Sequence, residues 1–339
     1  MKKISKTAFI TGVSGQDGAY LAKLLLSKKY QVVGLDRRSS RNNDWRLKFL
    51  GIENKIIREY CELSEFSSLQ RIFEKYKYNV DEVYNLAAQS FVGSSFDTPI
   101  STSDVNAFGP LRILEIIRSS KKKIKFYQAS TSEMFGNNGS QSLDENSFFN
   151  PQSPYAISKL YAHYITQNYR NSYGIFSCSG ILFNHESPLR GEEFVTRKIV
   201  LGLINILKKK QSCLYLGNIH TKRDWGYAED YVEAMWKMLQ AKKPKDYVVA
   251  TNKAYSVKDF ANRVCKYLQI KIRWRGTGLK EEAINLENNK TIIKISKKFY
   301  RPSDVFFLKG NFSKIKKELG WQPRHNLDDL VKFMIESES

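Results

Sequence analysis

Tyr155 and Lys159 are the residues of this sequence whose spacing points most directly to chemistry. They stand four positions apart in the segment SPYAISK, on a helix that the pattern starts near Pro154, so both side chains lie on one helical face. A tyrosine with an ordinary pKa of about 10 is a poor base at neutral pH, and an adjacent ammonium group favours its phenolate form. Lysine also suits a ribose hydroxyl of a cofactor. The pair predicts hydride chemistry.

A second polar group precedes this pair in the chain. The segment KFYQASTSE (125–133) is an apolar strand pattern that ends in Thr131, Ser132 and Glu133. Hydroxyl and carboxyl groups move protons as general acids and bases when they are held close to a substrate. Taken alone, Glu133 is as readily a solvated residue at a strand end. Beside Thr131 and upstream of Tyr155, it becomes a candidate base.

A glycine-rich turn near the start of the chain indicates what these groups act with. The strand pattern TAFIT (7–11) stops at Gly12, helical spacing begins at 19–26, and Gly12, Gly15 and Gly18 lie between them. Glycine lets the backbone turn tightly and approach a pyrophosphate, which the free N–H groups and dipole of the following helix also favour. The strand before and the helix after supply the required context, so the turn predicts binding of a dinucleotide.

Two opposing signals follow the second predicted strand, YQVVGLD, which ends at Asp36. A carboxylate at this place usually accepts hydrogen bonds from a ribose 2′-hydroxyl and favours NAD. The adjacent Arg37 and Arg38 suit the 2′-phosphate of NADP, although they are also readily explained as loop charges. NADP is the cofactor that we expect, with NAD as the alternative because of Asp36.

The ends of the predicted strands indicate where the cleft lies, and the strand pattern indicates the fold class. The pattern DEVYNLAAQS (81–90) is a buried strand that ends in small residues, like 125–133, and ligands of open parallel sheets lie beyond the carboxyl ends of strands. We expect an α/β chain: a Rossmann-type doubly wound parallel sheet with a smaller α/β cap domain for substrate. The cofactor domain is predicted at 5–180, rejoined by about 214–250, and the cap at 181–213 and 251–335.

The second half of the chain is less regular. NHESPLRGEEFVTRK is expected to be a loop followed by a helix, CLYLGN and DYVVAT to be short strands, and KRDWGYAEDYVEAMWKMLQ between them to be helical. From YSVKDFANRV to LDDLVKFMIE, helical and loop patterns alternate, and LGWQP closes a helix near Gly320. His185 and Glu186 lack an HExxH spacing, so no metal site is predicted.

Composition excludes several classes of protein. The 339 residues are 42% hydrophobic, enough for a sizeable core, and no apolar run approaches the roughly 20 residues that span a bilayer. We expect a cytoplasmic protein with isolated, reduced cysteines and no membrane partner. The net charge of +21 resembles that of a nucleic-acid binder, but the lysines form short runs at helix ends without interleaved aromatics, so no nucleic-acid partner is expected.

Segments along the whole chain resemble one family. The chain is similar to the extended short-chain dehydrogenase/reductases and, within them, to the GDP-mannose 4,6-dehydratase family, from about residue 5 to about residue 335. The matching segments, in chain order, are GVSGQDGAYLAKLLL, YNLAAQSFVGSSF, FYQASTSEMFG, SPYAISKLYAHYIT, GILFNHESPLRGEEFVTRKI, LYLGN, KRDWGYAEDYVEAMW, YRPSDV and LGWQP. NHESPLRG followed by FVTRK is far more specific than the glycine turn.

The resemblance implies roles for the catalytic candidates. Tyr155, with its pKa lowered by Lys159, would accept the proton of the sugar 4-hydroxyl, to which Thr131 would hydrogen-bond. Glu133 would remove the C5 proton, and with Ser132 it would deliver a proton to the departing 6-hydroxyl. Simple epimerases of the superfamily lack a carboxylate at this position, so Glu133 favours elimination.

The resemblance also implies two sets of binding residues. The nicotinamide cofactor is expected to contact Gly12, Ser14, Gly15, Gln16, Asp17, Gly18, Asp36, Arg37, Arg38, Glu62, Leu63, Leu86, Ala87, Ala88, Gln89, Ser90, Ser101, Tyr155, Lys159, His185 and Arg190. The GDP-sugar is expected to contact Ser90, Thr131, Ser132, Glu133, Tyr155, Asn184, Val195, Lys198, Gly217, Arg223, Arg301 and Asp304.

Three positions depart from the family pattern. Asp36 stands where most members have an apolar residue, Ser101 where some have a tyrosine near the nicotinamide ribose, and Asp304 where a glutamate is usual. These changes bear on the choice of cofactor and sugar and leave the catalytic groups intact.

Several alternatives stay open at this point. Close relatives act on GDP-D-glycero-D-manno-heptose, so this larger sugar is the alternative substrate to GDP-mannose. A nucleotide-sugar-binding protein without activity is a second hypothesis, against which the set Thr131, Glu133, Tyr155 and Lys159 argues. Family members form dimers and tetramers, with the segment 37–40 near a neighbouring subunit's cofactor site in tetramers. We expect a homotetramer, or otherwise a dimer.

Overall fold

A seven-stranded parallel sheet forms the larger part of the molecule. The computed structural model describes residues 6–39, 44–139, 142–300 and 303–338. In spatial order the sheet runs β11-β6-β5-β4-β1-β2-β3, and all of its pairs are parallel. Its strands are β1 (Thr7–Thr11), β2 (Gln31–Asp36), β3 (Ile57–Tyr60), β4 (Glu82–Asn85), β5 (Lys125–Thr131), β6 (Ser177–Leu182) and β11 (Tyr247–Val249). The order reverses direction between β1 and β4, which is the place where such sheets bind ligands.

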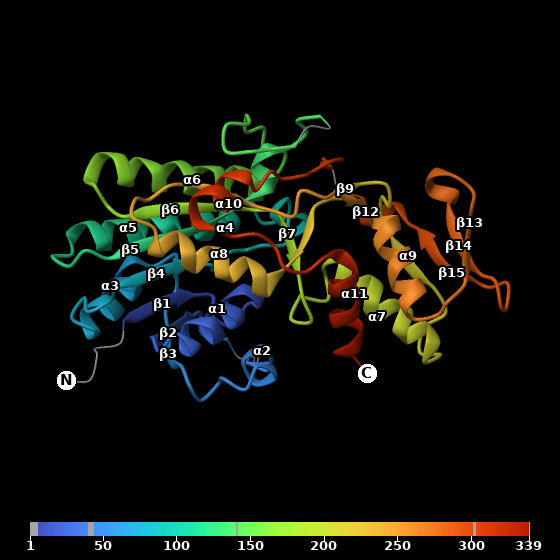
Figure 1. Ribbon diagram of the computed structural model, residues 1–339, viewed down its shortest axis with the longest axis horizontal. Helices are drawn as coiled ribbons and strands as arrows, with labels where there is room; N and C mark the ends of the chain where they lie inside the picture. The colour runs from blue at the N-terminus through green and yellow to red at the C-terminus, as the bar shows by residue number, and fades with distance from the viewer. Residues whose placement is uncertain (1–5, 40–43, 140–141, 301–302, 339) are drawn as a thin grey trace.

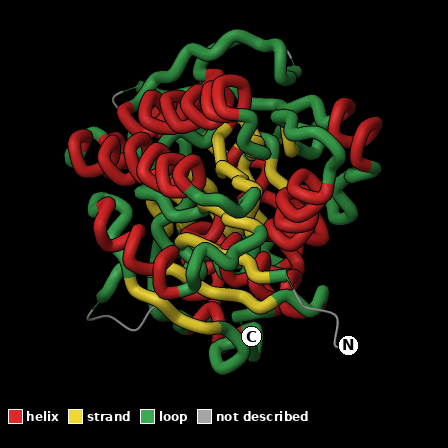
Figure 2. The backbone as a smooth tube through the Cα atoms, turned by 90° about the vertical axis from the view of Figure 1, so that its left-hand side faces the viewer, coloured by secondary structure: helices red, strands yellow, loops and turns green. Residues whose placement is uncertain are grey.

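Helices cover both faces of this sheet (Figures 1 and 2). On one face, α1 (Gln16–Ser27), α8 (Ala228–Gln240) and α10 (Ser313–Leu319) bury their apolar sides in one core cluster. On the other face, α3 (Phe66–Lys75), α5 (Gly109–Ser119) and α6 (Pro154–Tyr173) do the same. Strands buried on both faces explain why TAFIT and QVVGLD are nearly continuous apolar runs. This is the doubly wound Rossmann-type α/β fold that the sequence predicts.

A smaller body lies beyond the carboxyl ends of these strands, on the right of Figure 1. Its four-stranded sheet has the order β13-β14-β15-β8. The strands are β8 (Leu214–Leu216), β13 (Ile272–Arg275), β14 (Glu282–Asn285) and β15 (Thr291–Ile295), and α7 (Val195–Leu207), α9 (Val257–Tyr267) and α11 (Leu327–Glu336) cover them. A separate core cluster fills the space between this sheet and its helices. The shorter helices of the chain are α2 (Trp45–Phe49) and α4 (Pro99–Ser103).

Two pairs of short strands join the bodies. β7 (Asn184–Glu186) pairs in parallel with β10 (Trp225–Tyr227), and β9 (Lys222–Arg223) pairs antiparallel with β12 (Tyr255–Ser256). In Figure 1 they lie between the seven-stranded sheet and the smaller body. The chain therefore crosses between the two bodies several times.

Local signals fix the ends of the helices that matter most here. The Ser153 side chain accepts the N–H of Ala156 at 3.1 Å and Pro154 occupies the first turn, so α6 starts where the sequence predicts. The helix ends at Gly174, whose φ of 65° suits the left-handed region. Gly320 ends α10 in the same way, which confirms the helix end predicted at LGWQP.

The structure corrects one predicted helix and adds a sheet that was not predicted. Residues 222–227 were expected to be helical, but they form β9 and β10, and the helix begins only at Ala228. Strands of two or three residues are too short to show a period of two, so the helical spacing after them dominated the pattern. The strands β13 to β15 lie in the tail that we expected to alternate between helix and loop. β8, which we grouped with the first domain, pairs with β15, and the division of the chain into domains stays a prediction.

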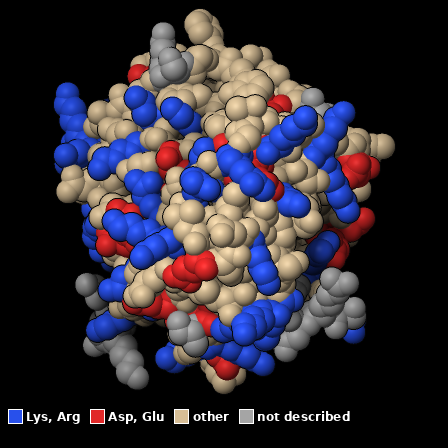
Figure 3. All heavy atoms as spheres, turned by 90° about the vertical axis from the view of Figure 1, so that its right-hand side faces the viewer, with Lys and Arg blue, Asp and Glu red and all other residues tan. Residues whose placement is uncertain are grey.

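The charged side chains are dispersed over the surface. On the face that the smaller body presents in Figure 3, lysine and arginine are spread widely, with acidic residues between them. In the described part of the chain, no helix combines the length and the apolar character that a bilayer crossing needs. All four cysteines are free thiols. Across residues 6–39, 44–139, 142–300 and 303–338, no cluster of three or more histidine, cysteine or acidic side chains is placed to hold a metal.

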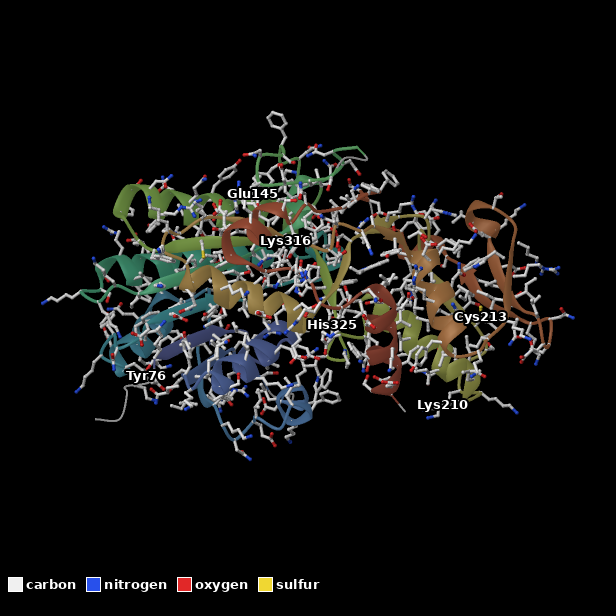
Figure 4. The ribbon with its side chains drawn as sticks, in the orientation of Figure 1. Tyr76, Glu145, Lys210, Cys213, Lys316 and His325 are labelled. Carbon is white, nitrogen blue, oxygen red and sulfur yellow. The ribbon has the colours of Figure 1, made fainter. Side chains whose placement is uncertain are left out.

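A buried aspartate fixes the last segment of the chain. Asp230 in α8 is fully buried and accepts hydrogen bonds from the backbone N–H groups of Arg324 and His325, at 2.9 and 3.1 Å. Figure 4 shows His325 near the centre of the molecule, between α8 and α11. The chain is thereby anchored to the first body before α11 returns to the second.

Candidate active site

A cleft lies at the carboxyl ends of the central strands. Its walls come from 86–92 after β4, 129–133 at the end of β5 and 182–185 after β6, together with side chains from α1, α6 and the loop before α7. Segments far apart in the sequence meet here because parallel strands end at the same edge of a sheet.

The glycine turn brings the backbone of one strand end against another. Gly12 has a φ of +70°, and a Cβ there would lie 2.9 Å from the Cα of Ala87. A Cβ on Gly18 would lie 2.3 Å from the carbonyl oxygen of Gly12, so α1 packs closely on the turn. Side chains at Gly12 and Gly18 would push the turn after β1 away from the end of β4 and from α1. The first turn of α1 has free backbone N–H groups. The turn thus forms a cradle of the kind that holds a pyrophosphate.

Asp36 at the end of β2 is already engaged by a cation. Its carboxylate forms an ion pair with Arg58 at 2.7 Å and accepts a long hydrogen bond from the N–H of Ser14 at 3.4 Å. Burial raises the pKa of Asp36, while Arg58 counteracts the rise. Arg37 and Arg38 follow it with exposed side chains. The carboxylate therefore faces the glycine turn while the two arginines extend into solvent.

Tyr155 and Lys159 lie together in the cleft, on one side of α6. Burial raises the pKa of Tyr155 to about 12, and the neighbouring Thr131 and Arg190 pull it down only in part. We expected Lys159 to lower this pKa. In the structure burial outweighs the lowering influences on Tyr155, and the Lys159 ammonium donates a hydrogen bond to the carbonyl oxygen of Ala129 at 3.0 Å.

Lys159 is almost completely buried, and burial lowers its pKa to about 8. The carbonyl of Ala129 is the only hydrogen-bond acceptor recorded for its ammonium group in the described residues. A charged lysine held this way destabilises the fold. Such a cost is typical of a group that is kept for chemistry rather than for packing.

Replacing Lys159 by methionine tests this cost. The fall from 10.5 to about 8 corresponds to about 3 kcal/mol, and losing the bond to Ala129 offsets about 1 kcal/mol of it. Because the folded pKa is the lower one, the unfolded chain binds the proton more readily between about pH 8 and 10.5, and wild-type stability rises with pH there. Urea unfolding should show Lys159→Met to be more stable than wild type below pH 8, with the difference shrinking towards pH 10.5.

Lys125 offers the matched control for that measurement. Its pKa is also lowered by burial, but its side chain is only half-buried and lies outside the cleft. Lys125→Met should change stability less than Lys159→Met at neutral pH. Equal stability of wild type and Lys159→Met at pH 7 would show that the buried ammonium costs nothing.

Glu133 lies in the cleft next to the end of β5. Thr131 is the last residue of the strand, and its hydroxyl accepts the N–H of Glu133 at 3.2 Å, which starts a short 3-10 helix. The Glu133 side chain is buried, and its Oε1 lies 4.0 Å from Nε of Arg223. Arg223 is in turn 3.7 Å from the Asp304 carboxylate. The predicted catalytic residues Thr131, Ser132 and Glu133 all line the cleft.

An ion pair crosses the cleft from the first helix to β7. His185 Nε2 lies 2.8 Å from the Asp17 carboxylate, its Nδ1 lies 2.7 Å from the carbonyl of Phe183, and its ring stacks on Tyr231. Burial alone would lower the pKa of His185, but Asp17 raises it above its ordinary value. In the same way, His185 outweighs the effect of burial on Asp17 and lowers the pKa of that carboxyl. Both partners are predicted cofactor residues, although their pairing was not predicted.

Aromatic rings form the wall opposite the catalytic helix. The Arg190 guanidinium lies 3.5 Å from the centre of the Phe194 ring and 3.0 Å from the Glu186 carboxylate. Phe194 meets Phe91, from the loop after β4, edge to face at 5.9 Å. The loops before α7 and after β4 therefore touch across the cleft.

The structure gathers part of the predicted set in this cleft. Among the predicted residues, those that line it are Asp17, Leu86, Ala88, Ser90, Thr131, Ser132, Glu133, Tyr155, Lys159, Asn184, His185 and Arg190. The predicted residues of the described chain that lie outside its walls are Gly12, Ser14, Gly15, Gln16, Gly18, Asp36, Arg37, Arg38, Glu62, Leu63, Ala87, Gln89, Ser101, Val195, Lys198, Gly217, Arg223 and Asp304. Arg301 lies outside the described residues.

Some of the outlying residues meet in a second group, on the smaller body. The Lys198 ammonium lies 3.2 Å from the centre of the Phe299 ring, and burial lowers its pKa. A Cβ on Gly217 would lie 2.4 Å from the carbonyl oxygen of Phe299. Lys198 and Gly217 thus share one neighbour, as residues that bind one ligand would.

Several residues that line the cleft were not predicted from the sequence. The residues not predicted are Phe91, Val92, Ala129, Ser130, Leu182, Phe183 and Phe194. Most of them adjoin a predicted residue in the chain: Phe91 follows Ser90 and Phe194 precedes Val195. Apolar residues next to a strand end ordinarily belong to the core, so their type did not indicate that they line a binding cleft.

Relatives of known name match nearly the whole chain. A family model described as GDP-mannose 4,6 dehydratase matches residues 9–334. The chain is 47% identical to GDP-mannose 4,6 dehydratase 1 of Arabidopsis thaliana, over 99% of this chain and 90% of that protein. It is 45% identical to GDP-mannose 4,6 dehydratase of Dictyostelium discoideum, over 99% of this chain and 96% of that protein.

Solved structures match the fold at lower identity. UDP-glucose 4-epimerase of Thermotoga maritima, solved with UDP-glucose, has a TM-score of 0.81 at 20% identity, over 98% of both chains. dTDP-glucose 4,6-dehydratase of Bacillus anthracis, solved with NAD, has a TM-score of 0.80 at 20% identity, also over 98% of both chains. At this identity the likeness concerns the fold.

Proposed function

Because the chain belongs to the GDP-mannose 4,6-dehydratase family, we infer that it converts GDP-mannose to GDP-4-dehydro-6-deoxymannose and water. The reaction oxidises C4, eliminates water across C5 and C6, and reduces C6, so that no net oxidation results. The observation that carries this function is the buried Glu133 carboxylate in one cleft with Thr131, Tyr155 and Lys159.

The chain's own residues fit a nicotinamide cofactor. The cradle of Gly12 and Gly18, which a Cβ would fill, suits its pyrophosphate, and the cleft beside Tyr155 suits its nicotinamide. When bound, such a cofactor takes a hydride from the sugar and returns one. Lys159 would hold a ribose hydroxyl, and the pair of Asp17 and His185 would close the side of the cleft.

We propose NADP as the preferred form of this cofactor. Asp36 already pairs with Arg58 at 2.7 Å, which leaves less of its carboxylate for a ribose 2′-hydroxyl. The exposed Arg37 and Arg38 are suited to a 2′-phosphate through charge-assisted hydrogen bonds.

Removing both arginines tests the cofactor preference. In the double variant Arg37→Ala/Arg38→Ala, the dissociation constant of NADP should rise at least about tenfold, since each charge-assisted bond contributes about 1.5–3 kcal/mol, while that of NAD changes little. Calorimetric titration measures both constants. Arg71→Ala, another exposed arginine of the same body, serves as the control. Equal losses for NADP and NAD would contradict the proposal.

Two residues of the site serve the oxidation of C4, in which the 4-hydroxyl loses its proton. Tyr155 accepts this proton, and Thr131 hydrogen-bonds the same hydroxyl from the end of β5. Since burial raises the pKa of Tyr155 to about 12, cations brought into the cleft assist the transfer by favouring the phenolate. Arg190, which lowers this pKa in part, is one such cation.

Two other residues serve the elimination, in which C5 loses a proton and C6 loses its hydroxyl. Glu133 removes the C5 proton, which the 4-keto group acidifies, and then passes a proton to the departing 6-hydroxyl with Ser132. Both side chains are buried in the cleft wall, so bulk water is kept from the reacting carbons.

The smaller body would hold the nucleotide. Lys198 and Arg223 offer cations for the diphosphate, and Asn184 lines the cleft. Asn184 Oδ1 is buried without a hydrogen-bond partner among the described residues, as expected of a group that awaits a ligand. Val195, Gly217, Arg301 and Asp304 complete the proposed set.

Incubation of the purified protein with each sugar nucleotide tests the substrate. GDP-mannose should give the 4-keto-6-deoxy product, and the amount of nicotinamide cofactor consumed should be negligible beside the product formed. Turnover of GDP-D-glycero-D-manno-heptose without turnover of GDP-mannose would overturn the inferred substrate. Binding of both without any 4-keto product would favour a protein that only binds the nucleotide sugar.

We propose a homotetramer built from two faces. One face carries exposed apolar side chains of α4, the turn after it and α6, which are Ile100, Phe108, Ile157, Tyr161 and Tyr164. The other contains the exposed segment that starts at Arg37. Light scattering should give a mass near four chains, and a mass of one chain would contradict the proposal.

A further inference from the structure

The strand that carries Arg223 is held where the chain crosses between the two bodies. β9 pairs on one side with β12, where Tyr255 is opposite Arg223. On its other side, Lys222 exchanges backbone hydrogen bonds with Phe306 and Leu308, at 2.8 and 3.0 Å. Three separate crossings thus lie side by side, and Figure 1 shows β9 and β12 between the two bodies.

Arg223 and Asp224 use opposite sides of this strand. Successive side chains of an extended chain point in opposite directions. Arg223 reaches towards the Glu133 and Asp304 carboxylates. Asp224 instead meets the other two crossings: its Oδ1 accepts the N–H of Thr251 at 2.8 Å and the Thr251 hydroxyl at 2.6 Å, and its Oδ2 accepts the N–H of Gly310 at 3.2 Å.

Asp224 has no direct part in the proposed chemistry, yet it is fully buried. A buried carboxylate is costly unless several donors satisfy it. Here the donors belong to Thr251 and Gly310, which lie far apart in the sequence. Gly310 also packs tightly on Ala250, since a Cβ on Gly310 would lie 2.3 Å from the Cβ of Ala250. The carboxylate therefore ties Asp224 to two segments that are themselves in close contact.

We propose that Asp224 is a positioning residue that holds Arg223 in place for the sugar nucleotide by tying its strand to Thr251 and Gly310. The inference rests on the proposed role of Arg223 in substrate binding. It predicts an effect on KM for GDP-mannose, because the strand bearing Arg223 shifts, with little effect on the proton transfers at Tyr155 and Glu133.

Asp224→Asn is the most selective change. The amide oxygen still accepts hydrogen bonds from Thr251, but the NH₂ group then faces the N–H of Gly310. The hydrogen bond to Gly310 is therefore lost, while those from Thr251 remain. The expected result is a KM for GDP-mannose raised at least about fivefold and a kcat within about threefold of wild type.

A matched control separates positioning from stability. Asp246 is a partly buried aspartate that also joins two elements, through Arg170 and the N–H of Ser179, but it lies outside the cleft. Asp246→Asn should lower the melting temperature and leave KM unchanged. Thr251→Val removes one donor only and should raise KM for GDP-mannose, though less than Asp224→Asn. If Asp224→Asn does not fold, a KM equal to that of wild type in Thr251→Val overturns the inference.

Arg223→Ala and the double variant Arg223→Ala/Asp224→Asn distinguish the two ways of failing. If Arg223→Ala leaves KM unchanged, the proposed binding role of Arg223 is wrong and the inference falls with it. If Arg223→Ala raises KM but Asp224→Asn does not, or if the two effects add fully in the double variant, Asp224 does not act through Arg223. A double variant no weaker than Arg223→Ala supports the inference.

Discussion

The Glu133→Gln variant should form product from about a hundredfold to ten-thousandfold more slowly than wild type, the usual contribution of a general base. Glutamine keeps the shape of the side chain at the end of β5, but its amide cannot take the C5 proton. KM for GDP-mannose should change little, since the lost interaction belongs to the transition state. Product formation measured by chromatography gives both constants.

Isotope exchange shows which step is lost. In deuterated water, wild type should place deuterium at C5, whereas Glu133→Gln should not. Oxidation at C4 does not need Glu133, so adding GDP-mannose to the variant should still produce the absorbance of reduced nicotinamide. Glu145→Gln is the control, because Glu145 accepts the N–H of Val248 at 2.7 Å and lies outside the cleft. Figure 4 places it at the edge of the first body. Normal turnover by Glu133→Gln would assign the C5 proton to another group.

The Tyr155→Phe variant should fail one step earlier. It loses only the hydroxyl of a ring that is almost completely buried, so cofactor and GDP-mannose should bind nearly as before. Without a group to accept the 4-hydroxyl proton, C4 is not oxidised and no reduced nicotinamide appears. We expect kcat to fall by about a hundredfold or more, with no C5 exchange, because exchange requires the 4-keto sugar.

The pH dependence of the wild type belongs to the same test. A base acts in its deprotonated form, and burial raises the pKa of Tyr155 to about 12, so the rate of C4 oxidation should rise with pH across the neutral and alkaline range. Tyr155→Phe should lose this rise along with the activity. Tyr161→Phe, an exposed tyrosine of the same helix, should retain both. A rate in Tyr155→Phe that still rises like that of wild type would exclude Tyr155 as the base.

The sequence predicted the parts of the site that local rules determine. The turn from Gly12 to Gly18 needs glycine because another backbone approaches it, and that need is visible as a spacing. Tyr155 and Lys159 share a helical face because they are four residues apart. Thr131 and Glu133 follow a strand whose neighbours end at the same edge. In each case, the chemistry is set by position within one element or by the common edge of a parallel sheet.

The parts that the sequence did not reveal depend on contacts between distant elements. Asp17 and His185 pair across the cleft, and nothing in the spacing of GQDG or NHE predicts that they meet. Arg223 was predicted as a binding residue, but its strand of two residues is too short to show a period, so its position beside Glu133 was not predicted. The pKa of Tyr155 depends on how deeply the assembled fold buries it, which outweighs the effect expected from the nearby lysine.

The anchoring of residues 324 and 325 by Asp230 has a consequence for synthesis on the ribosome. The core of the smaller body needs Leu327, Leu330 and Val331 of α11 to cover the helices α7 and α9. These residues follow all seven strands of the larger sheet in the chain, so that sheet can form while the smaller body is still incomplete. A nascent chain that lacks α11 therefore carries a formed sheet beside a smaller body whose core is incomplete, with apolar surface exposed to quality control.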